Sequence, residues 1–260
     1  MLPRIQVRPP RILLVANLGP YLCIGIAYRD PFTLIKDRSW KYGINTPYGL
    51  HDAVRTPLEE HYESYRNGHI DGTTIPTYFF CGDCGSGKSA NATDFSHTLV
   101  ECAPYHSELK ARLSGAKVFH VGLTGQNSLI EFEFESPLEA IGIRMLHHLL
   151  GTWLPLDDTR ETYVAPTPLE VFRSVAKFEG RDLSEDFTGV LVVDDLHSFI
   201  KSEKRWMDRE KYFRRALAGI GEIARDPEGS FIVTCCTSLI SDPVEKYYKR
   251  TKGKWVNLPY

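Results

Sequence analysis

The octapeptide GDCGSGKS at residues 82–89 constrains the fold of this chain more than any other segment. Three of its eight residues are glycines, which allow backbone torsions that other residues rarely adopt. The apolar run IPTYFFC at 75–81 comes directly before it and is typical of a β-strand. A segment that favours a helix begins at Ser89. The sequence therefore predicts a strand, a tight loop and a helix in immediate succession.

The same octapeptide matches the pattern G-x-x-x-x-G-K-[ST] in full, and each residue type has its own physical use. The glycines let successive backbone N–H groups turn toward the oxygens of one anion. Lys88 supplies a point charge for the outer phosphates of a nucleotide, and the Ser89 hydroxyl suits Mg²⁺. A glycine-rich turn that contains Lys-Ser by chance is the alternative, which the flanking strand and helix disfavour. The predicted nucleotide-binding residues are Gly82, Asp83, Cys84, Gly85, Ser86, Gly87, Lys88 and Ser89.

A second apolar run ends in two carboxylates. GVLVV at 189–193 is followed by Asp194 and Asp195 and is typical of a strand buried on both faces. Because a nucleotide-bound Mg²⁺ needs a carboxylate, we expect this strand to neighbour the one before the phosphate loop. Asp194 would hold the metal with Ser89, through water, and Asp195 would activate the attacking water. Asp195 is shorter than the glutamate that many ATPases carry there, and a solvated turn with two carboxylates is the alternative.

Hydroxyl groups follow a third apolar run, SFIVTCC at 230–236. Thr237 and Ser238 would lie at the end of a further strand, where a polar side chain can sense the γ-phosphate or position water. We select Thr237 as the catalytic candidate. The alternative is that both residues only form a turn, as Thr and Ser often do.

Strand-like runs alternate with helical segments over residues 51–260. This order predicts an α/β fold with a mainly parallel sheet flanked by helices. Residues 1–50 form an N-terminal extension of unknown role, with one strand-like run at 11–16, and 51–260 form the domain that contains the phosphate loop. The expected strands are 75–81, 117–123, 189–193 and 230–236. The expected helices are 51–67, 89–113 with an interruption at Pro104, 137–150, 168–178 and 208–225.

Composition excludes several classes of protein. Lys and Arg total 31 and Asp and Glu total 33, so the formal net charge of −2 excludes a globally basic nucleic-acid binder. Six cysteines in 260 residues are too few for a disulfide scaffold, and the pair Cys81 and Cys84 lacks partners for a zinc site. The cysteines are therefore expected to be reduced thiols, which favours a location in the cytoplasm or nucleus. No apolar stretch reaches the roughly 18 residues of a membrane span.

Two basic segments suggest partners. The segment EKYYKRTKGKW at 245–255 interleaves cations with aromatic rings, which suits a nucleic-acid strand, although a solvated terminal extension is the plainer interpretation. A second basic run at 201–215 could supply an arginine to another subunit, but acidic residues offset it and we select none of its members. His147 and His148 lie on an apolar helix without further ligands, so we expect them to pack rather than to bind metal.

Taken in order, these motifs resemble the P-loop NTPase domain shared by Crinkler effectors and retrotransposon hot spot proteins. The resemblance covers roughly residues 50–260. It rests on TPLEEHYESYRNG (56–68), YFFCGDCGSGKS (78–89), KVFHVGLTGQNS (117–128), SPLEAIGIRMLHHLL (136–150), GVLVVDDLHSF (189–199), SFIVTCCTSLISDP (230–243) and WVNLP (255–259).

The resemblance implies an ATPase fold of the additional-strand type. It also implies that Lys88 and Ser89 bind nucleotide and magnesium and that Asp194 and Asp195 form the acidic motif. Family members commonly carry an N-terminal header and a nuclease-like or kinase-like C-terminal module, and neither is recognisable here. A stand-alone, degenerate or truncated member is therefore expected, and a true effector would be secreted into a host cell.

Two functions follow from the sequence. The first is Mg²⁺-dependent ATP binding and hydrolysis, coupled to a nucleic-acid or effector task, with a homo-oligomer or a protein partner. The alternative is a nucleotide-binding effector or interaction module with little or no hydrolysis, which the short Asp195 favours. A small-molecule kinase would need an acceptor site that is not evident, and a GTPase would need an N-K-x-D motif that the sequence lacks.

Overall fold

The computed structural model covers most of the chain after the N-terminal extension. The described residues are 48–69, 71–105, 107–150, 155–180, 187–200, 206–226 and 229–260. The extension up to residue 47, with the strand expected at 11–16, lies outside them.

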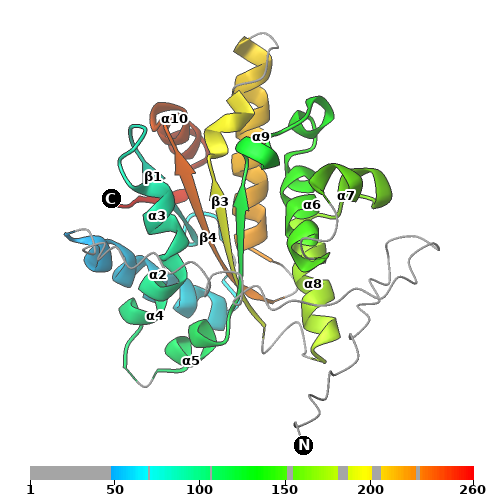
Figure 1. The fold of residues 1–260 in the computed structure, drawn as a ribbon. Helices are drawn as coiled ribbons and strands as arrows, with labels where there is room; N and C mark the ends of the chain where they lie inside the picture. The colour runs from blue at the N-terminus through cyan, green and yellow to red at the C-terminus, as the bar shows by residue number, and fades with distance from the viewer. Residues whose placement is uncertain are drawn as a thin grey trace, which may run out of the picture.

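A five-stranded sheet forms the centre of the described structure. Its strands are β1 (Pro76–Cys81), β2 (Lys117–Gly122), β3 (Thr188–Asp194), β4 (Phe231–Ser238) and β5 (Lys254–Asn257). They pair in parallel in the order β2-β3-β4-β1-β5 (Figure 1). This confirms the predicted α/β fold with a parallel sheet flanked by helices, in the additional-strand arrangement. The expectation that the phosphate-loop strand and the acidic strand are neighbours is wrong, because β4 lies between β1 and β3.

The central strands are buried on both faces. All eight residues of β4 are buried, including the polar Thr234 and Thr237. Such burial explains why these strands are continuous apolar runs in the sequence rather than alternating ones. β5 differs because it is an edge strand of four residues, three of them partly exposed and one fully exposed.

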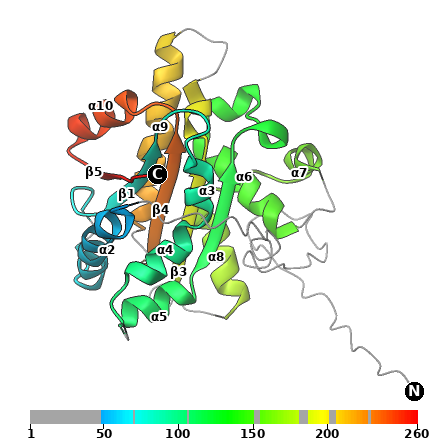
Figure 2. The same ribbon diagram turned by 60° about the vertical axis from the view of Figure 1, so that its left-hand side comes forward.

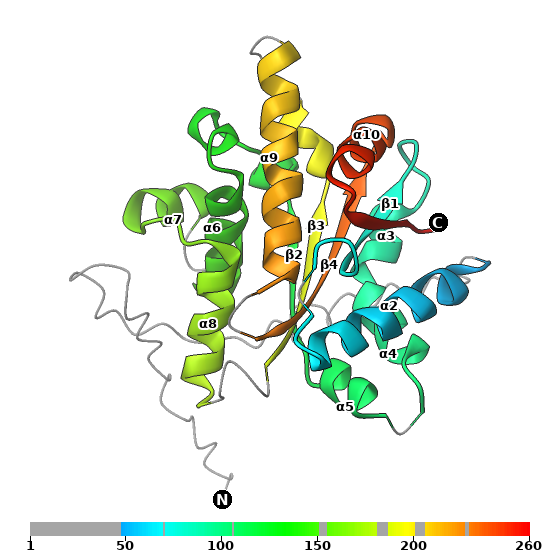
Figure 3. The ribbon, with the colours of Figure 1, turned by 180° about the vertical axis from the view of Figure 1, so that it is seen from behind.

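Helices cover both faces of the sheet in two layers (Figures 2 and 3). Successive side chains of β1 lie on opposite faces of the sheet. Tyr78 and Phe80 pack in one hydrophobic core, and Phe79 packs in the other. The layer over Tyr78 consists of α2 (Leu50–Arg66), α3 (Lys88–Thr93), α4 (Phe95–Cys102) and α5 (Glu108–Ser114). The layer over Phe79 consists of α6 (Pro137–Leu150), α8 (Pro168–Phe178), α9 (Trp206–Ala224) and α10 (Asp242–Thr251). The short helix α7 (Leu156–Thr162) packs against α6.

The helices at 137–150 and 168–178 have the predicted bounds. α8 begins where a capping box forms, because Thr167 and Glu170 each accept a hydrogen bond from the other's backbone N–H. The helical region expected over 89–113 is instead three helices, interrupted at Asp94 as well as near Pro104. α7 is not among the helices expected from the sequence. Among the described residues, no helix is long and apolar enough to cross a membrane.

The basic aromatic segment at 245–255 is part of the domain rather than an extension. It forms most of α10 and the start of β5. Tyr248 is buried and stacks on Trp255 with 6.3 Å between ring centroids, and Trp255 also packs against Phe79. These two rings are therefore committed to the core, and a nucleic acid would meet mainly the cations of this segment.

Gly142 of α6 offers a test of the packing between α6 and the segment before α8. A Cβ atom at Gly142 would overlap with the backbone carbonyl of Pro166, whereas one at Gly221 of α9 would have its nearest neighbour 3.5 Å away, at Arg225 Nη2. We expect Gly142→Ala to lower the free energy of unfolding by about 1–3 kcal/mol, because backbone atoms must move. Gly221→Ala, the matched control, should raise it by up to about 1 kcal/mol through helix propensity. Chemical denaturation measures both, and equal stability of the two variants would contradict this packing.

Candidate functional site

Parallel pairing brings the predicted site residues to one edge of the sheet. Cys81 at the end of β1 is in register with Ser238 at the end of β4, and Gly122 at the end of β2 is in register with Asp194. The N–H of Gly82 donates to the carbonyl of Ser238 at 3.1 Å, which fixes the start of the phosphate loop to β4. Segments more than 100 residues apart in the sequence therefore meet at the carboxyl ends of the strands, where ligands bind in open α/β sheets.

The phosphate loop has the backbone that an anion site requires, but only two of its glycines provide it. Gly85 and Gly87 have φ angles of 80° and 91°, in the left-handed region. Within the described part of the chain, their N–H groups donate to no backbone carbonyl. Backbone N–H groups in such turns form concave sites for anions. The expectation of unusual torsions at Gly82 is wrong, since its φ is not positive.

Lys88 lies folded over the phosphate loop. Its side chain is buried, and its ammonium group donates to the carbonyl of Asp83 and to Ser86 Oγ, the latter at 3.2 Å. Both acceptors belong to the loop itself. The positive charge thus lies beside the two left-handed glycines, where phosphate oxygens could replace these acceptors.

A short chain of hydrogen bonds joins the phosphate loop to the acidic pair. Ser89 Oγ donates to Asp194 Oδ1 at 3.0 Å, although 105 residues separate them. The Thr237 hydroxyl donates to the same carboxylate oxygen and accepts from the N–H of Asp195 at 2.8 Å. Thr237 is fully buried, so it holds Asp194 and Asp195 in place from β4. Ser238, by contrast, bonds to both the N–H and the carbonyl of Ile240 and forms a turn.

Asp195 has a strained backbone. Its φ angle is 62°, which is rare for a residue other than glycine and is found where a function or the surroundings require it. Thr124, directly after β2, donates to Asp195 Oδ2 at 2.7 Å. The other carboxylate oxygen, Oδ1, lies 3.8 Å from His197 Nδ1. Thr124 is not among the site residues predicted from the sequence, because its hydroxyl reaches Asp195 only when β2 and β3 pair.

A buried ion cluster fixes the loop that carries Thr124. Arg144 of α6 is 1% exposed, and its guanidinium group donates to the carbonyls of Asn127 and Ser128 at 2.7–2.9 Å. It also forms two hydrogen bonds of 2.9 Å to Glu133, whose carboxylate accepts two more from Arg160. Burial lowers the pKa of Arg144, and the Glu133 carboxylate opposes that shift. An arginine inside an otherwise apolar helix is the sequence signal that could have revealed this cluster.

The oxygen atoms at this edge fit a magnesium ion bound with a nucleotide. Ser89 Oγ and Asp194 Oδ1 are hard oxygen donors that already lie at hydrogen-bond distance from each other. Mg²⁺ in such sites takes one or two protein oxygens and completes its shell with phosphate oxygens and water. No group of three or more His, Cys, Asp or Glu side chains in the described ranges could hold a metal ion by protein ligands alone.

The cysteine pair and the histidine pair are the other candidate metal ligands. Burial raises the pKa of the Cys81 thiol to about 12, so it stays protonated, and Cys84 is exposed on the loop. His147 Nδ1 lies 3.0 Å from the Thr159 hydroxyl, in agreement with a packing role.

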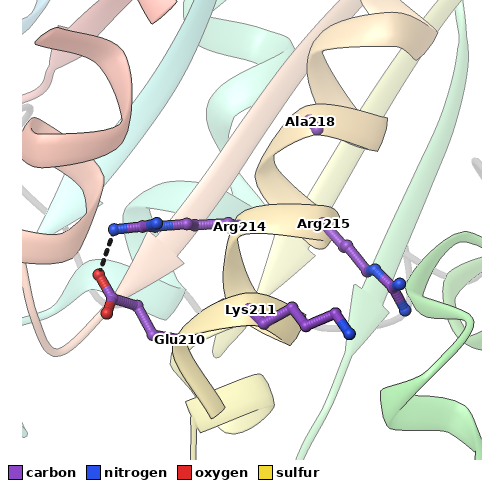
Figure 4. A pocket seen from close by; sticks show the side chains of 5 residues that line it. All are labelled: Glu210, Lys211, Arg214, Arg215 and Ala218. Carbon is purple, nitrogen blue, oxygen red and sulfur yellow. Dashed lines mark hydrogen bonds and ion pairs between the residues drawn. The ribbon is translucent and has the colours of Figure 1, made fainter. Parts of the chain in front are cut away.

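The basic run at 201–215 contributes a hollow on α9. Its lining residues are Glu210, Lys211, Arg214, Arg215 and Ala218, around a volume of about 310 Å³ (Figure 4). Arg214 forms an ion pair of 2.6 Å with Glu210, and Arg215 donates to the carbonyl of Glu135 at 3.4 Å. The side chains from 201 to 209 lie outside the description. No member of this hollow is bonded to the phosphate loop.

Comparison with known proteins gives remote structural likeness alone. No protein-family model and no curated protein matches the chain. The ORC1 protein of Aeropyrum pernix in complex with DNA is 14% identical, with a TM-score of 0.38 over 82% of this chain and 46% of that chain. The ORC2 protein of the same organism, with ADPNP and ADP, is 12% identical, with a TM-score of 0.40 over 86% and 51%. The ADP form of the ORC2 protein is 13% identical, with a TM-score of 0.36 over 77% of this chain and 47% of that chain. This chain thus spans about half the length of those chains.

Two threonines of β4 provide a matched test of the hydrogen-bond chain. Both are fully buried, but Thr234 Oγ1 has no hydrogen-bond partner among the described residues, whereas Thr237 Oγ1 has two. Thr237→Val should lower the free energy of unfolding by about 1–3 kcal/mol, because the N–H of Asp195 loses its acceptor. Thr234→Val should leave it unchanged or raise it. Urea denaturation of both variants measures the difference, and equal effects would contradict a bridging role for Thr237.

Proposed function

We propose that this protein binds ATP together with Mg²⁺ and hydrolyses the bond between the β- and γ-phosphates. The observation that carries the proposal is the hydrogen bond of 3.0 Å between Ser89 of the phosphate loop and Asp194 of the acidic strand. It brings the two halves of a nucleotide–magnesium site together across an intervening strand. A glycine-rich turn without a nucleotide role would not need a carboxylate there.

The phosphate loop would bind and orient the triphosphate. The N–H groups of Gly85 and Gly87 donate to phosphate oxygens, and Lys88 exchanges its contacts with Asp83 and Ser86 for the outer phosphates. Ser89 and Asp194 hold Mg²⁺, directly and through water respectively. When bound, Mg²⁺ would neutralise part of the charge on the β- and γ-phosphate oxygens.

Asp195 would position the attacking water. Its backbone is strained, with a φ angle of 62°, and Thr124 holds one of its two carboxylate oxygens. The second oxygen accepts a hydrogen bond from water and aligns that water for in-line attack on the γ-phosphate. Thr237 acts through the two aspartates, since its hydroxyl is already bonded to both residues.

A specific observation also favours the alternative, a nucleotide-binding module with little hydrolysis. Asp195 is one methylene shorter than a glutamate, and Thr124 occupies one of its oxygens at 2.7 Å. Both features make the Asp195 carboxylate less able to contact the attacking water. Membership of the Crinkler and retrotransposon hot spot group, effector activity, and a nucleic-acid or protein partner remain predictions from the sequence.

Nucleotide binding is tested at Lys88. Lys88→Ala should abolish measurable Mg²⁺-dependent ATP binding in isothermal titration calorimetry, because the loop loses its only lysine. Lys177→Ala, at an exposed position on α8, is the matched control and should bind as the wild type does. Undiminished binding by Lys88→Ala would contradict the proposed site.

Hydrolysis is tested at Asp195. Asp195→Asn keeps the shape but removes the charge, so phosphate release should fall about a hundredfold while ATP affinity is retained. Asp158→Asn, on the exposed face of α7, is the control. Asp195→Glu separates the two functions, since a large gain in turnover would identify the wild type as the slow-hydrolysing module. Unchanged turnover in Asp195→Asn would exclude Asp195 from catalysis.

A further inference from the structure

The strand order fixes the direction in which a bound nucleotide would lie, given the proposed function. Ser89, Asp194 and Thr237 mark the γ-phosphate end, on the side of the phosphate loop that faces β3 and β4. On the opposite side of β1 lies only β5 among the described strands. Because a triphosphate is an extended chain and its γ end would lie near Asp194, the ribose and base would leave the loop toward β5.

Tyr260 lies at that position. Asn257 of β5 is in register with Phe79, and the next N–H, that of Leu258, donates to the carbonyl of Phe79 at 2.7 Å. The chain thereby continues along β1 toward the phosphate loop. A Cβ atom at Gly82 would overlap with Tyr260 Oη, so the phenol end of the ring rests on the first glycine of the loop. Figure 2 shows the end of the chain beside β1 and α3.

Tyr260 is exposed although Leu258, two residues before it, is buried. Tyr260 is 44% exposed, whereas Leu258 is 1% exposed and anchors the segment in the core. A tyrosine that served packing alone would turn its ring inward, as Tyr248 does beneath Trp255. An exposed tyrosine that is anchored three residues beyond the end of β5 suits stacking against another flat ring.

We propose that Tyr260 is the base-contacting residue of the site and stacks on the nucleobase of the bound nucleotide. The contact also accounts for Gly82, whose torsions do not require glycine but whose missing side chain admits the phenol. Stacking on a tyrosine ring tolerates any base, because every base has a π-face. Tyr260 thus contributes affinity for a nucleoside triphosphate over inorganic polyphosphate, without selecting adenine.

Titration with ATP and with tripolyphosphate, both with Mg²⁺, tests this role. Tyr260→Ala should weaken ATP binding about tenfold and leave tripolyphosphate binding unchanged, since only ATP has a base to stack. Tyr260→Phe should keep the affinity for ATP, and Tyr260→Leu should behave as the alanine variant does. Tripolyphosphate serves as the internal control for an intact loop. Tyr105→Ala, which removes an exposed tyrosine between α4 and α5, should match the wild type.

Several outcomes would overturn the role of Tyr260. Equal ATP affinity in Tyr260→Ala and the wild type would show that Tyr260 does not contact the base. A parallel loss of ATP and tripolyphosphate binding would show that Tyr260 only supports the phosphate loop. Tighter binding of both ligands would make it an obstruction. These results leave the proposed function standing, because the wild type still binds both ligands. A wild type that binds neither would instead contradict the proposed function and this inference together.

Discussion

The contact between Ser89 and Asp194 is the interaction on which the rest of the site depends. It joins the loop after β1 to the end of β3, although β4 lies between them. β4 contributes the buried Thr237 hydroxyl, which donates to Asp194 and accepts from the N–H of Asp195. A single hydroxyl therefore holds the carboxylate of Asp194 and the backbone of Asp195. Without the parallel register of β1, β4 and β3, the three segments would not meet.

Rigid packing surrounds this contact. Arg144 and Glu133 form a buried pair, and Arg144 also binds the backbone carbonyls of the loop after β2. A buried ion pair of this kind often adds little net stability but is strongly unfavourable to break. Its effect here is positional, because the loop that it holds carries Thr124 to Asp195. The strained backbone at Asp195 persists because these neighbours determine it.

Much of this arrangement could be predicted from the sequence, for physical reasons that differ by element. Strands buried on both faces leave continuous apolar runs, so β1, β3 and β4 are readable, and the glycine-rich loop specifies its own backbone at Gly85 and Gly87. The placement of β4 between β1 and β3 cannot be read from the apolar runs, because paired strands are distant in the sequence; only the resemblance to the additional-strand type implies it. The roles of Thr124 and Tyr260 cannot be predicted from their neighbours in the sequence, because each residue contacts one that is distant in the sequence.

The proposed site holds one triphosphate and one Mg²⁺ between the phosphate loop and Asp194. A crystal structure of the wild-type protein with Mg²⁺ and a non-hydrolysable ATP analogue would locate both. We expect the β- and γ-phosphates within the loop at 82–89 and Ser89 Oγ about 2 Å from the metal. We also expect Lys88 to have left Asp83 for the phosphates. A nucleotide bound elsewhere, with the hydrogen bond between Ser89 and Asp194 intact and the loop empty, would contradict the proposed site.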